Sequence, residues 1–340
     1  MGPYRFALQP SDIELSEQVL QPFSLGIFAF EPRSSGVSVR RGFFEGRRHY
    51  RLPYRLWLPE SPRAAVVLLH GAFDYGGAFD ALSPVFAARG FATLAYDQRG
   101  FGETKTRGRW GGARTMARDI ATAVALLKAR APGVPVFILG ESMGGALAVR
   151  AAAQGMVPGV SGLVLVAPGA LACTLRRTAY AVIARVLRAL GSRAEFFAQR
   201  IRGDDLSSEA TIRLLADPLV LRRVSPSIIS GLVSAGATAV DLAPRVRIPS
   251  LTLIGSREDI STVACVRKLH TRLGGNADWA EFAGGPHLLL HWQESARVLE
   301  RIFDWLEARL DQSASSEAED PRRDLSPAQQ APAAVSMAAE

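Results

Sequence analysis

The chain of 340 residues contains few cysteines and few lysines. Only Cys173 and Cys265 occur, and neither lies in a CxxC or metal-ligand spacing, so the sequence predicts no disulfide framework and no metal site. This composition fits a reducing compartment. The lysines are limited to Lys105, Lys128 and Lys268, so the formal net charge of +8 comes almost wholly from arginine. Because these arginines are spread along the chain, we expect no nucleic-acid partner.

The sequence also lacks a long uninterrupted apolar stretch. Residues 1–10 contain no basic segment followed by an apolar one, and residues 23–30 are too few and too interrupted for a membrane span. We therefore expect a cytoplasmic protein that touches membranes peripherally if it touches them at all. With 48% hydrophobic residues, the chain can bury the core of one large domain that carries an insertion.

Apolar runs alternate with helical patterns from about residue 37 onward. Short aliphatic and β-branched runs are typical of buried strands, which we expect at 54–58, 64–69, 93–96, 136–139, 163–167, 251–254 and 278–282. Good helix formers with helical periodicity predict helices at 79–89, 115–130, 143–154 and 292–310. This alternation predicts an α/β fold with a mostly parallel sheet flanked by helices.

The alternation breaks after Pro168. Residues 170–244 show amphipathic helical patterns and no convincing strand, so we interpret them as a helical lid inserted into the sheet domain. Within this lid, Tyr180, Ile183 and Leu187 share an apolar face that can hold an acyl chain. Four arginines flank that helix and either bind anionic lipid or form an ordinary solvated face; they are Arg176, Arg177, Arg185 and Arg188.

The same patterns divide the whole chain. Residues 37–169 and 245–311 form the two parts of the core, on either side of the lid. Residues 1–36 form an N-terminal extension. Residues 312–340 are rich in Ala, Ser, Pro and Gln and carry no large apolar residues in sequence, so we expect a disordered tail.

The sequence GESMGG at 140–145 lies between the predicted strand at 136–139 and an Ala-rich helix. This is the context that a nucleophile elbow requires, in which a sharp strand-to-helix turn exposes a serine hydroxyl. The pattern predicts that Ser142 is a nucleophile and that the backbone N–H of Met143 donates to an oxyanion. A structural turn without catalysis is the alternative.

The tripeptide HGA at 70–72 follows the predicted strand at 64–69. In a nucleophile-elbow fold the loop after this strand supplies the second oxyanion donor, so we expect the N–H of Ala72 to act with Met143. His70 ends a buried strand, which favours a structural role over that of a general base.

The catalytic base should come last in the chain order of serine, acid and histidine. His287 lies on a glycine-rich loop between the last predicted strand and the last helix, and we favour it over His291, which is better placed to pack or cap that helix. The acid should follow the strand at 251–254, where Glu258 and Asp259 are adjacent. Glu258 is preferred, and Asp259 remains open if the loop bulges by one residue.

Together HGA, the DQRGFG segment at 97–102, GESMGG and the GPHLLLHW segment at 285–292 resemble the monoacylglycerol lipase and lysophospholipase-like branch of the α/β-hydrolases, the serine aminopeptidase S33-type hydrolases. The resemblance covers residues 50–310. It implies an α/β-hydrolase fold with an inserted helical lid, Ser142 as the nucleophile, His287 as the base, and Ala72 and Met143 as oxyanion donors. It also implies that Arg99 braces loops near the site.

Two positions depart from the family pattern. Glu258 stands where the family usually has aspartate, which leaves the identity of the acid open. Tyr75 stands where relatives that prefer monoacylglycerols often have a second histidine, which weakens the assignment of the substrate.

The residues therefore predict a serine hydrolase that cleaves acyl esters, of the monoacylglycerol or lysophospholipid type, through a Ser-His-acid triad and an acyl-enzyme. This chemistry needs no cofactor and no metal. A peptidase, thioesterase or C–C hydrolase on the same scaffold is the first alternative, and a catalytically silent binding protein is the second. The sequence does not determine the oligomeric state.

Overall fold

The protein, here in a computed structural model, is described over residues 36–170, 182, 186, 196–197 and 205–318. Eight strands of these residues form one sheet in the order β1-β2-β4-β3-β5-β6-β9-β10. β2 (Tyr50–Pro59) pairs antiparallel with β1 (Val37–Gly46) and with β4 (Phe91–Tyr96), and the other neighbours run parallel. The remaining strands are β3 (Ala64–Leu69), β5 (Val136–Glu141), β6 (Gly162–Val166), β9 (Ser250–Gly255) and β10 (Ala277–Phe282).

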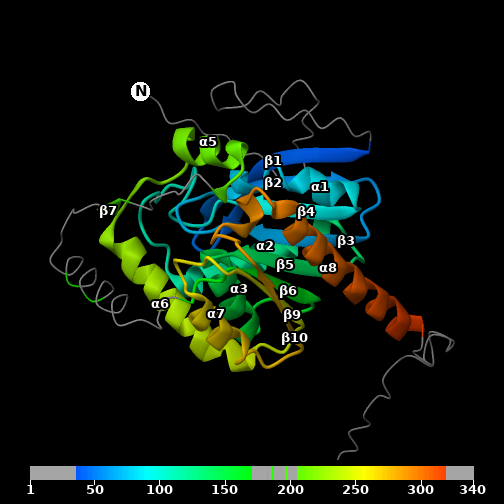
Figure 1. The fold of residues 1–340 in the computed structure, drawn as a ribbon. Coiled ribbons are helices and arrows are strands. Elements are labelled where there is room, and N and C mark those ends of the chain that lie inside the picture. Colours follow the sequence, from blue (N-terminus) through cyan, green and yellow to red (C-terminus); the bar gives the residue numbers. More distant parts are fainter. Residues whose placement is uncertain (1–35, 171–181, 183–185, 187–195, 198–204, 319–340) are drawn as a thin grey trace, which may run out of the picture.

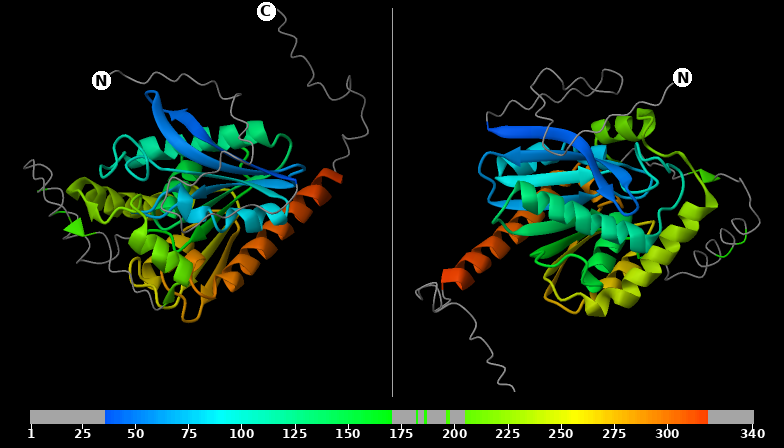
Figure 2. Two further views of the ribbon diagram at one scale, coloured as in Figure 1. Left: turned by 90° about the horizontal axis from the view of Figure 1, so that it is seen from above. Right: turned by 180° about the vertical axis from the view of Figure 1, so that it is seen from behind.

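Helices cover both faces of this sheet (Figures 1 and 2). One face packs against α1 (Ser83–Ala88) and α8 (Ser295–Ala318). The other packs against α2 (Ala113–Arg130), α3 (Met143–Ala153), α6 (Pro226–Leu242) and α7 (Val263–His270). The mostly parallel sheet between helical layers confirms the predicted fold class.

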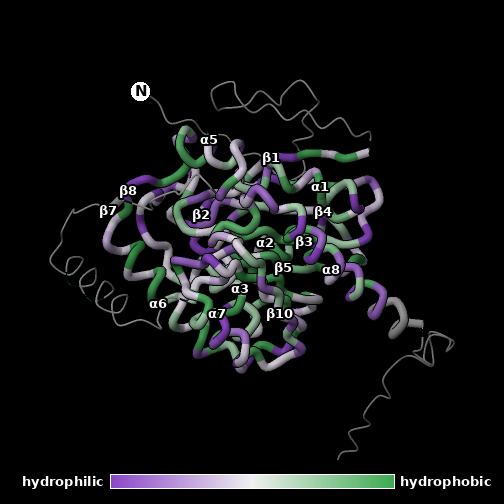
Figure 3. The backbone as a smooth tube through the Cα atoms, in the orientation of Figure 1, coloured by the Kyte–Doolittle hydropathy of each residue, from purple (hydrophilic) through white to green (hydrophobic). Residues whose placement is uncertain are grey.

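Alternation along the central strands explains this layering. In β3, Val66 belongs to the core under α1 and α8, and Val67 belongs to the core under α2 and α3. Both side chains are fully buried, and each such burial contributes about 1.5–3 kcal/mol to folding. Figure 3 shows the resulting concentration of hydrophobic residues in the central strands. A strand buried on both faces holds its ends firmly, and the site lies at such ends.

The N-terminal hairpin and the first helix differ from the prediction. β1 was not predicted, because all its residues except the buried Phe44 are exposed or partly exposed and form no continuous apolar run. The helix predicted at 79–89 is divided into η2 (Gly76–Phe79) and α1. Pro84 lies in the first turn of α1, where its missing N–H and fixed φ favour the start of a helix over its interior.

The last helix also differs from the prediction at both ends. η6 (Leu289–His291) occupies the region before it, so α8 begins at Ser295. α8 then continues to Ala318, beyond the predicted end at 310 and into the segment that we expected to be disordered. Each added residue brings one more helical hydrogen bond, which favours extension of a helix that already exists. Residues 319–340 lie outside the described part.

The described part of the predicted lid is mainly helical. It contains α5 (Ser208–Ala216), α6 and the short η5 (Ala243–Arg245). A two-residue pairing of β7 (Phe196–Phe197) with β8 (Arg223–Val224) corrects the expectation that this segment has no strand. Strands this short carry no detectable periodicity. The predicted apolar face at Tyr180, Ile183 and Leu187 and the four flanking arginines lie outside the described residues.

One helical stretch of the described part, Pro226–Arg245, is long and apolar enough to cross a membrane by length and composition. More than half of its apolar window is buried inside the protein. α6 packs against α3, and a Cβ added at Gly231 would overlap the ring of Trp110. These contacts are those of a core helix.

Candidate active site

Ser142 lies at the corner between β5 and α3. Its backbone has φ 50° and ψ −113°, a left-handed conformation that a residue other than glycine adopts rarely and at a cost in energy. Hydrogen bonds on both sides hold this conformation, because the N–H of Ser142 donates to the carbonyl of Val166 at 2.9 Å and its carbonyl accepts from Gly169 at 2.8 Å. The strained turn raises the hydroxyl above the carboxyl ends of the strands.

Two glycines permit this corner. A Cβ added at Gly140 would lie 2.6 Å from the carbonyl carbon of Gly144, and one added at Gly144 would overlap the backbone of Leu69. Strand, turn and helix therefore approach one another more closely than any side chain would allow. The GESMGG segment thus has the structural context of a nucleophile elbow.

His287 connects the predicted nucleophile to one of the two predicted acids. Its Nε2 lies 3.0 Å from Ser142 Oγ, and its Nδ1 lies 2.6 Å from Glu258 Oε2. A proton on Nδ1 satisfies both contacts, because Nδ1–H then donates to the carboxylate and Nε2 accepts from the serine hydroxyl. This is the order of groups that nucleophilic catalysis by serine requires.

The loop after β9 directs Glu258, and not Asp259, toward His287. The backbone N–H groups of Ile260 and Ser261 each donate to Glu258 Oε1 at 2.7 Å, which turns this side chain inward. Asp259 is exposed. A Cβ added at Gly255 would overlap the backbone of Gly285, so the loop that carries the acid can approach the loop that carries the histidine only with glycine there.

These contacts set the charges of the pair. Burial by itself raises the pKa of Glu258, but the charge and hydrogen bond of His287 and the backbone N–H groups of Ser261 and Ile260 more than offset it, so the pKa lies below the ordinary glutamate value. Burial by itself lowers the pKa of His287, and Glu258 reverses this, so the pKa of the imidazole is raised. The acid is therefore charged, and the base is strengthened.

The two predicted oxyanion donors lie on the loop after β3 and at the first residue of α3. Leu69 pairs with Gly140 across β3 and β5, which brings the loop after β3 beside Ser142. A Cβ added at Gly71 would lie 3.5 Å from Ser142 Cβ, so Ala72 follows directly after a point of contact with the elbow. Met143 is the first residue of α3, and its N–H lies at a helix N-terminus.

His70 is held by the backbone. Its Nδ1 donates to the carbonyl of Gly71 at 2.7 Å, and its Nε2 accepts from the N–H of Gln98 at 3.0 Å. Both ring nitrogens are thus occupied, in agreement with the structural role expected for it.

The DQRGFG segment likewise braces loops. Arg99 forms an ion pair with Asp119, donates to the carbonyl of Arg47 at 2.8 Å and lies over the ring of Tyr50. Asp97 accepts from the N–H of Gly76 at 2.9 Å. These contacts fix the loops around the site without reaching Ser142.

The sequence reasoning missed a set of contacts between α5 and the loop after β3. Arg213 of α5 donates to both oxygens of Asp74 at 2.6 and 2.8 Å, and the hydroxyl of Tyr75 donates to Asp217 at 2.6 Å. Burial by itself raises the pKa of Asp74, but Arg213 lowers it below the ordinary value. Because Asp74 and Arg213 are 139 positions apart, no local pattern in the sequence links them.

A second missed pair lies directly behind the elbow. Glu141 occupies the variable position of the G-x-S-x-G motif and is 2% exposed, and His291 is 7% exposed. His291 Nε2 lies 3.7 Å from Glu141 Oε2. The available signal was an acidic residue directly after a predicted buried strand and beside the predicted nucleophile.

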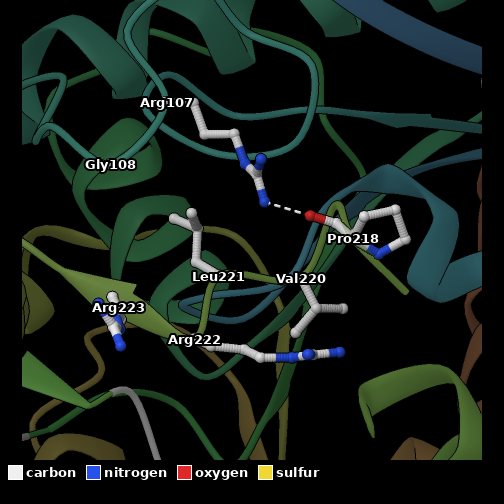
Figure 4. Close-up of a pocket in the computed structure, with 7 residues that line it drawn as sticks. All are labelled: Arg107, Gly108, Pro218, Val220, Leu221, Arg222 and Arg223. Carbon is white, nitrogen blue, oxygen red and sulfur yellow. Dashed lines mark hydrogen bonds between the residues drawn. The ribbon is translucent and has the colours of Figure 1, made fainter. Parts of the chain in front are cut away.

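A separate hollow of about 570 Å³ lies at the edge of the lid, between the loop at 107–108 and residues 218–223 (Figure 4). Arg107 donates to the carbonyl of Pro218 there. In Figure 4 the side chains of Arg222 and Arg223 point in different directions and do not converge on one point. The hollow contains none of the predicted site residues.

Comparison with known proteins gives one family. The family model described as serine aminopeptidase, S33, matches residues 60–294. A monoacylglycerol lipase of Mycolicibacterium smegmatis is 28% identical over 281 residues, which cover 78% of this chain and 96% of that protein. A mouse monoglyceride lipase is 31% identical over 217 residues, which cover 60% of this chain and 68% of that protein.

The fold has solved relatives as well. A soluble variant of monoglyceride lipase from Saccharomyces cerevisiae, solved with a substrate analogue, superposes with a TM-score of 0.68 at 19% identity and covers 84% of this chain and 99% of that one. At this identity the likeness concerns the fold.

Proposed function

The chain belongs to the serine aminopeptidase S33 family of α/β-hydrolases, in its monoacylglycerol lipase-like branch, and from this premise we propose that it cleaves acyl esters through a covalent intermediate on Ser142. The protein is a hydrolase, and its substrate is a small ester or lipid. Ser142, His287 and Glu258 form the proposed triad.

The observation that carries this proposal is the position of His287 between Ser142 Oγ and Glu258 Oε2, at 3.0 and 2.6 Å. A hydroxyl at its ordinary pKa is a weak nucleophile and needs an adjacent base. A buried, strengthened imidazole within hydrogen-bonding distance meets that need.

In the proposed reaction, Ser142 Oγ attacks the ester carbonyl carbon while its proton passes to His287 Nε2. Glu258 stabilises the imidazolium that results. The tetrahedral intermediate then expels the alcohol, which takes the proton from His287 and leaves an acyl group on Ser142. Water attacks this ester with His287 again as the base, and the carboxylic acid leaves.

We assign the oxyanion to the N–H groups of Ala72 and Met143. One lies on the loop after β3, which the pairing of Leu69 with Gly140 brings beside the elbow, and the other lies on the first residue of α3. Removal of one such donor typically costs a factor of about 10²–10³ in kcat.

For the substrate we propose a monoacylglycerol or a lysophospholipid. The names of the relatives favour a monoacylglycerol. Tyr75 stands where relatives that prefer monoacylglycerols often have a histidine, which keeps a lysophospholipid open. We further propose that residues 170–244 act as a lid, because α5 and its neighbours attach to the loop that carries Ala72. Peripheral contact between this lid and a membrane would bring the enzyme to such substrates.

The test is labelling with a fluorophosphonate, which reacts with activated serines. The intact protein should label, Ser142→Ala should not, and hydrolysis should fall about 10⁶-fold in that variant, since the other groups cannot act without the nucleophile. Ser38→Ala, which changes an exposed serine of β1, serves as the control. An intact protein that does not label would be a silent binding protein.

A substrate panel separates the remaining alternatives. It should contain p-nitrophenyl esters of graded length, monoacylglycerols, lysophospholipids, a thioester and an aminoacyl amide. Highest kcat/KM on a lipid ester supports the proposal. A protein that labels at Ser142 but prefers the thioester or the amide would be a thioesterase or a peptidase.

A further inference from the structure

Glu141 immediately precedes Ser142 and takes no part in the proposed chemistry. Its side chain is buried, and Oε1 has no hydrogen-bond partner within the described residues. Buried polar atoms in native proteins are nearly always paired, because an unpaired one costs about 1–3 kcal/mol. A carboxyl group left in this way beside the nucleophile therefore requires an explanation.

His291 supplies the complementary group. Its ring is buried, and its Nε2 also has no hydrogen-bond partner in the described part of the chain. This nitrogen lies 3.7 Å from Glu141 Oε2, whereas a hydrogen bond needs about 2.7–3.2 Å. A small side-chain rotation closes the gap. If the carboxyl group keeps its proton on Oε2, its O–H donates to Nε2 of a neutral His291, which gives Nε2 a partner and leaves no charge on the unpartnered Oε1.

Burial outweighs the surrounding charges and favours this neutral pair. Glu141 is faced by His287 from the loop after β10, His291 from η6, Asp74 from the loop after β3 and Arg213 from α5. His287, Arg213 and a hydrogen bond from the backbone of Leu290 lower the pKa of Glu141, and Asp74 raises it. Both cations are already bonded to another carboxylate, and burial outweighs their effect.

Burial accordingly raises the pKa of Glu141 to about 7 and lowers the pKa of His291 to about 4. Between about pH 4 and about pH 7 both groups are therefore uncharged.

The position of Glu141 makes its charge important. A Cβ added at Gly71 would lie 4.0 Å from Glu141 Oε2 and 3.5 Å from Ser142 Cβ, so the carboxyl group lies close behind the loop that carries Ala72. A negative charge there opposes the negative charge that develops on the substrate oxygen. It also favours the imidazolium form of His287, but Glu258 already supplies that stabilisation at 2.6 Å.

We propose that Glu141 is a positioning residue that acts in its protonated form, donating a hydrogen bond to His291 Nε2 behind Ser142, and that its ionisation slows ester hydrolysis. This inference rests on the proposed function of Ser142. The only bond that changes at Glu141 is its O–H bond, whose proton passes to solvent.

The experiment compares the pH dependence of kcat for the wild type, Glu141→Gln and the exposed control Glu294→Gln, with acid release measured by pH-stat on a short-chain ester. The wild type should give a bell-shaped profile that falls about tenfold or more from its optimum to pH ~9. Glu141→Gln should rise to a plateau, because its amide donates to His291 at every pH and never becomes charged. Glu294→Gln should match the wild type.

Two results would overturn the proposal. One is an alkaline decline that persists in Glu141→Gln. The other is a kcat of Glu141→Gln that is lower than that of the wild type above neutral pH, which would mean that the ionised carboxylate assists His287. Absence of Ser142-dependent hydrolysis in the wild type would instead reject the proposed function, and is recognised separately by the Ser142→Ala control.

A direct measurement does not depend on turnover. Difference infrared spectra of Ser142→Ala should contain the C=O stretch of a protonated carboxyl group at pH ~6 that disappears as the pH rises through about 7. The band should be absent from the double variant Ser142→Ala/Glu141→Gln. A spectrum without this band in Ser142→Ala contradicts the proposal even if Glu141→Gln fails to fold.

Discussion

Two buried carboxyl groups face His287 from different parts of the molecule. Glu258, on the loop after β9, accepts from two backbone N–H groups and from the imidazole, and its pKa is lowered. Glu141, at the end of β5, accepts from the backbone of Leu290, but its Oε1 has no partner among the described residues, and its pKa is raised. Both are almost fully buried, so burial alone does not decide their charge. The number of hydrogen-bond donors that contact each carboxyl group decides its charge.

Of the changes that test this comparison, the largest loss of kcat is expected at Glu258. Glu258→Gln removes the negative charge that orients His287 and stabilises its imidazolium, and we expect kcat to fall by about 10³-fold or more. Asp259→Asn changes an exposed side chain on the same loop and should stay within about twofold. Steady-state hydrolysis of one ester by the two variants measures the contrast. A larger loss of kcat in Asp259→Asn than in Glu258→Gln would show that Asp259 is the acid and that the assignment to Glu258 is wrong.

The pH dependence of the same variant tests the direction in which Glu258 shifts the pKa of His287. Glu258 raises the pKa of His287, so the wild-type rate should fall with acidification at a pH above the ordinary histidine value. In Glu258→Gln the acid limb of the residual activity should shift to lower pH, since an uncharged partner no longer favours the imidazolium. An acid limb that does not move would contradict the assignment.

The sequence predicted the groups whose neighbours are local. Ser142 and His287 were predicted because a glycine-flanked turn after a strand is recognisable in a few residues, and the structure brings the two side chains together. For the acid the sequence preferred Glu258 but left Asp259 open, because a shift of one residue in the loop exchanges an inward side chain for an outward one. Two backbone donors at Ile260 and Ser261 decide that choice, and they follow from the loop conformation.

The same reasoning explains what was missed. The strands at the centre were predicted from continuous apolar runs, whereas β1 and the pairing of β7 with β8 have no such runs. The ion pair of Asp74 with Arg213 joins segments far apart in the chain and appears only when α5 packs against the loop after β3. The roles proposed for these residues, for Ala72 and for Met143 remain predictions.

Asp74 offers an intermediate case, because one arginine decides its charge. Arg213→Met should convert Asp74 into a second buried carboxylate without a counter-charge, at a cost of about 3–5 kcal/mol in stability. Its pKa should then rise, as that of Glu141 does. Because the pKa of Asp74 is lowered in the wild type, the ion pair stabilises the fold fully above the ordinary aspartate pKa, and the stabilisation is lost as the pH falls through the lowered value.

Urea unfolding at neutral pH measures the loss in Arg213→Met. The double variant Asp74→Asn/Arg213→Met should recover part of it, since no buried charge remains. Arg222→Met, which changes an exposed arginine nearby, is the control. Equal stability of Arg213→Met and the wild type would show that α5 is held by its other contacts.

The smallest change in kcat is expected for a substitution beside Glu141, which tests the environment of this carboxyl group. Gly71→Ala would place a methyl group 4.0 Å from Glu141 Oε2 and 3.5 Å from Ser142 Cβ, both ordinary van der Waals distances. The added methyl puts one more apolar group beside the carboxyl group without supplying a donor, so the pKa of Glu141 should rise further. We expect kcat at its optimum to change by less than about threefold, which is small for a substitution on the oxyanion loop. The alkaline limb should move to higher pH. A limb that moves to lower pH would mean that the loop opens and admits water, and the donors around Glu141 would then have to be reconsidered.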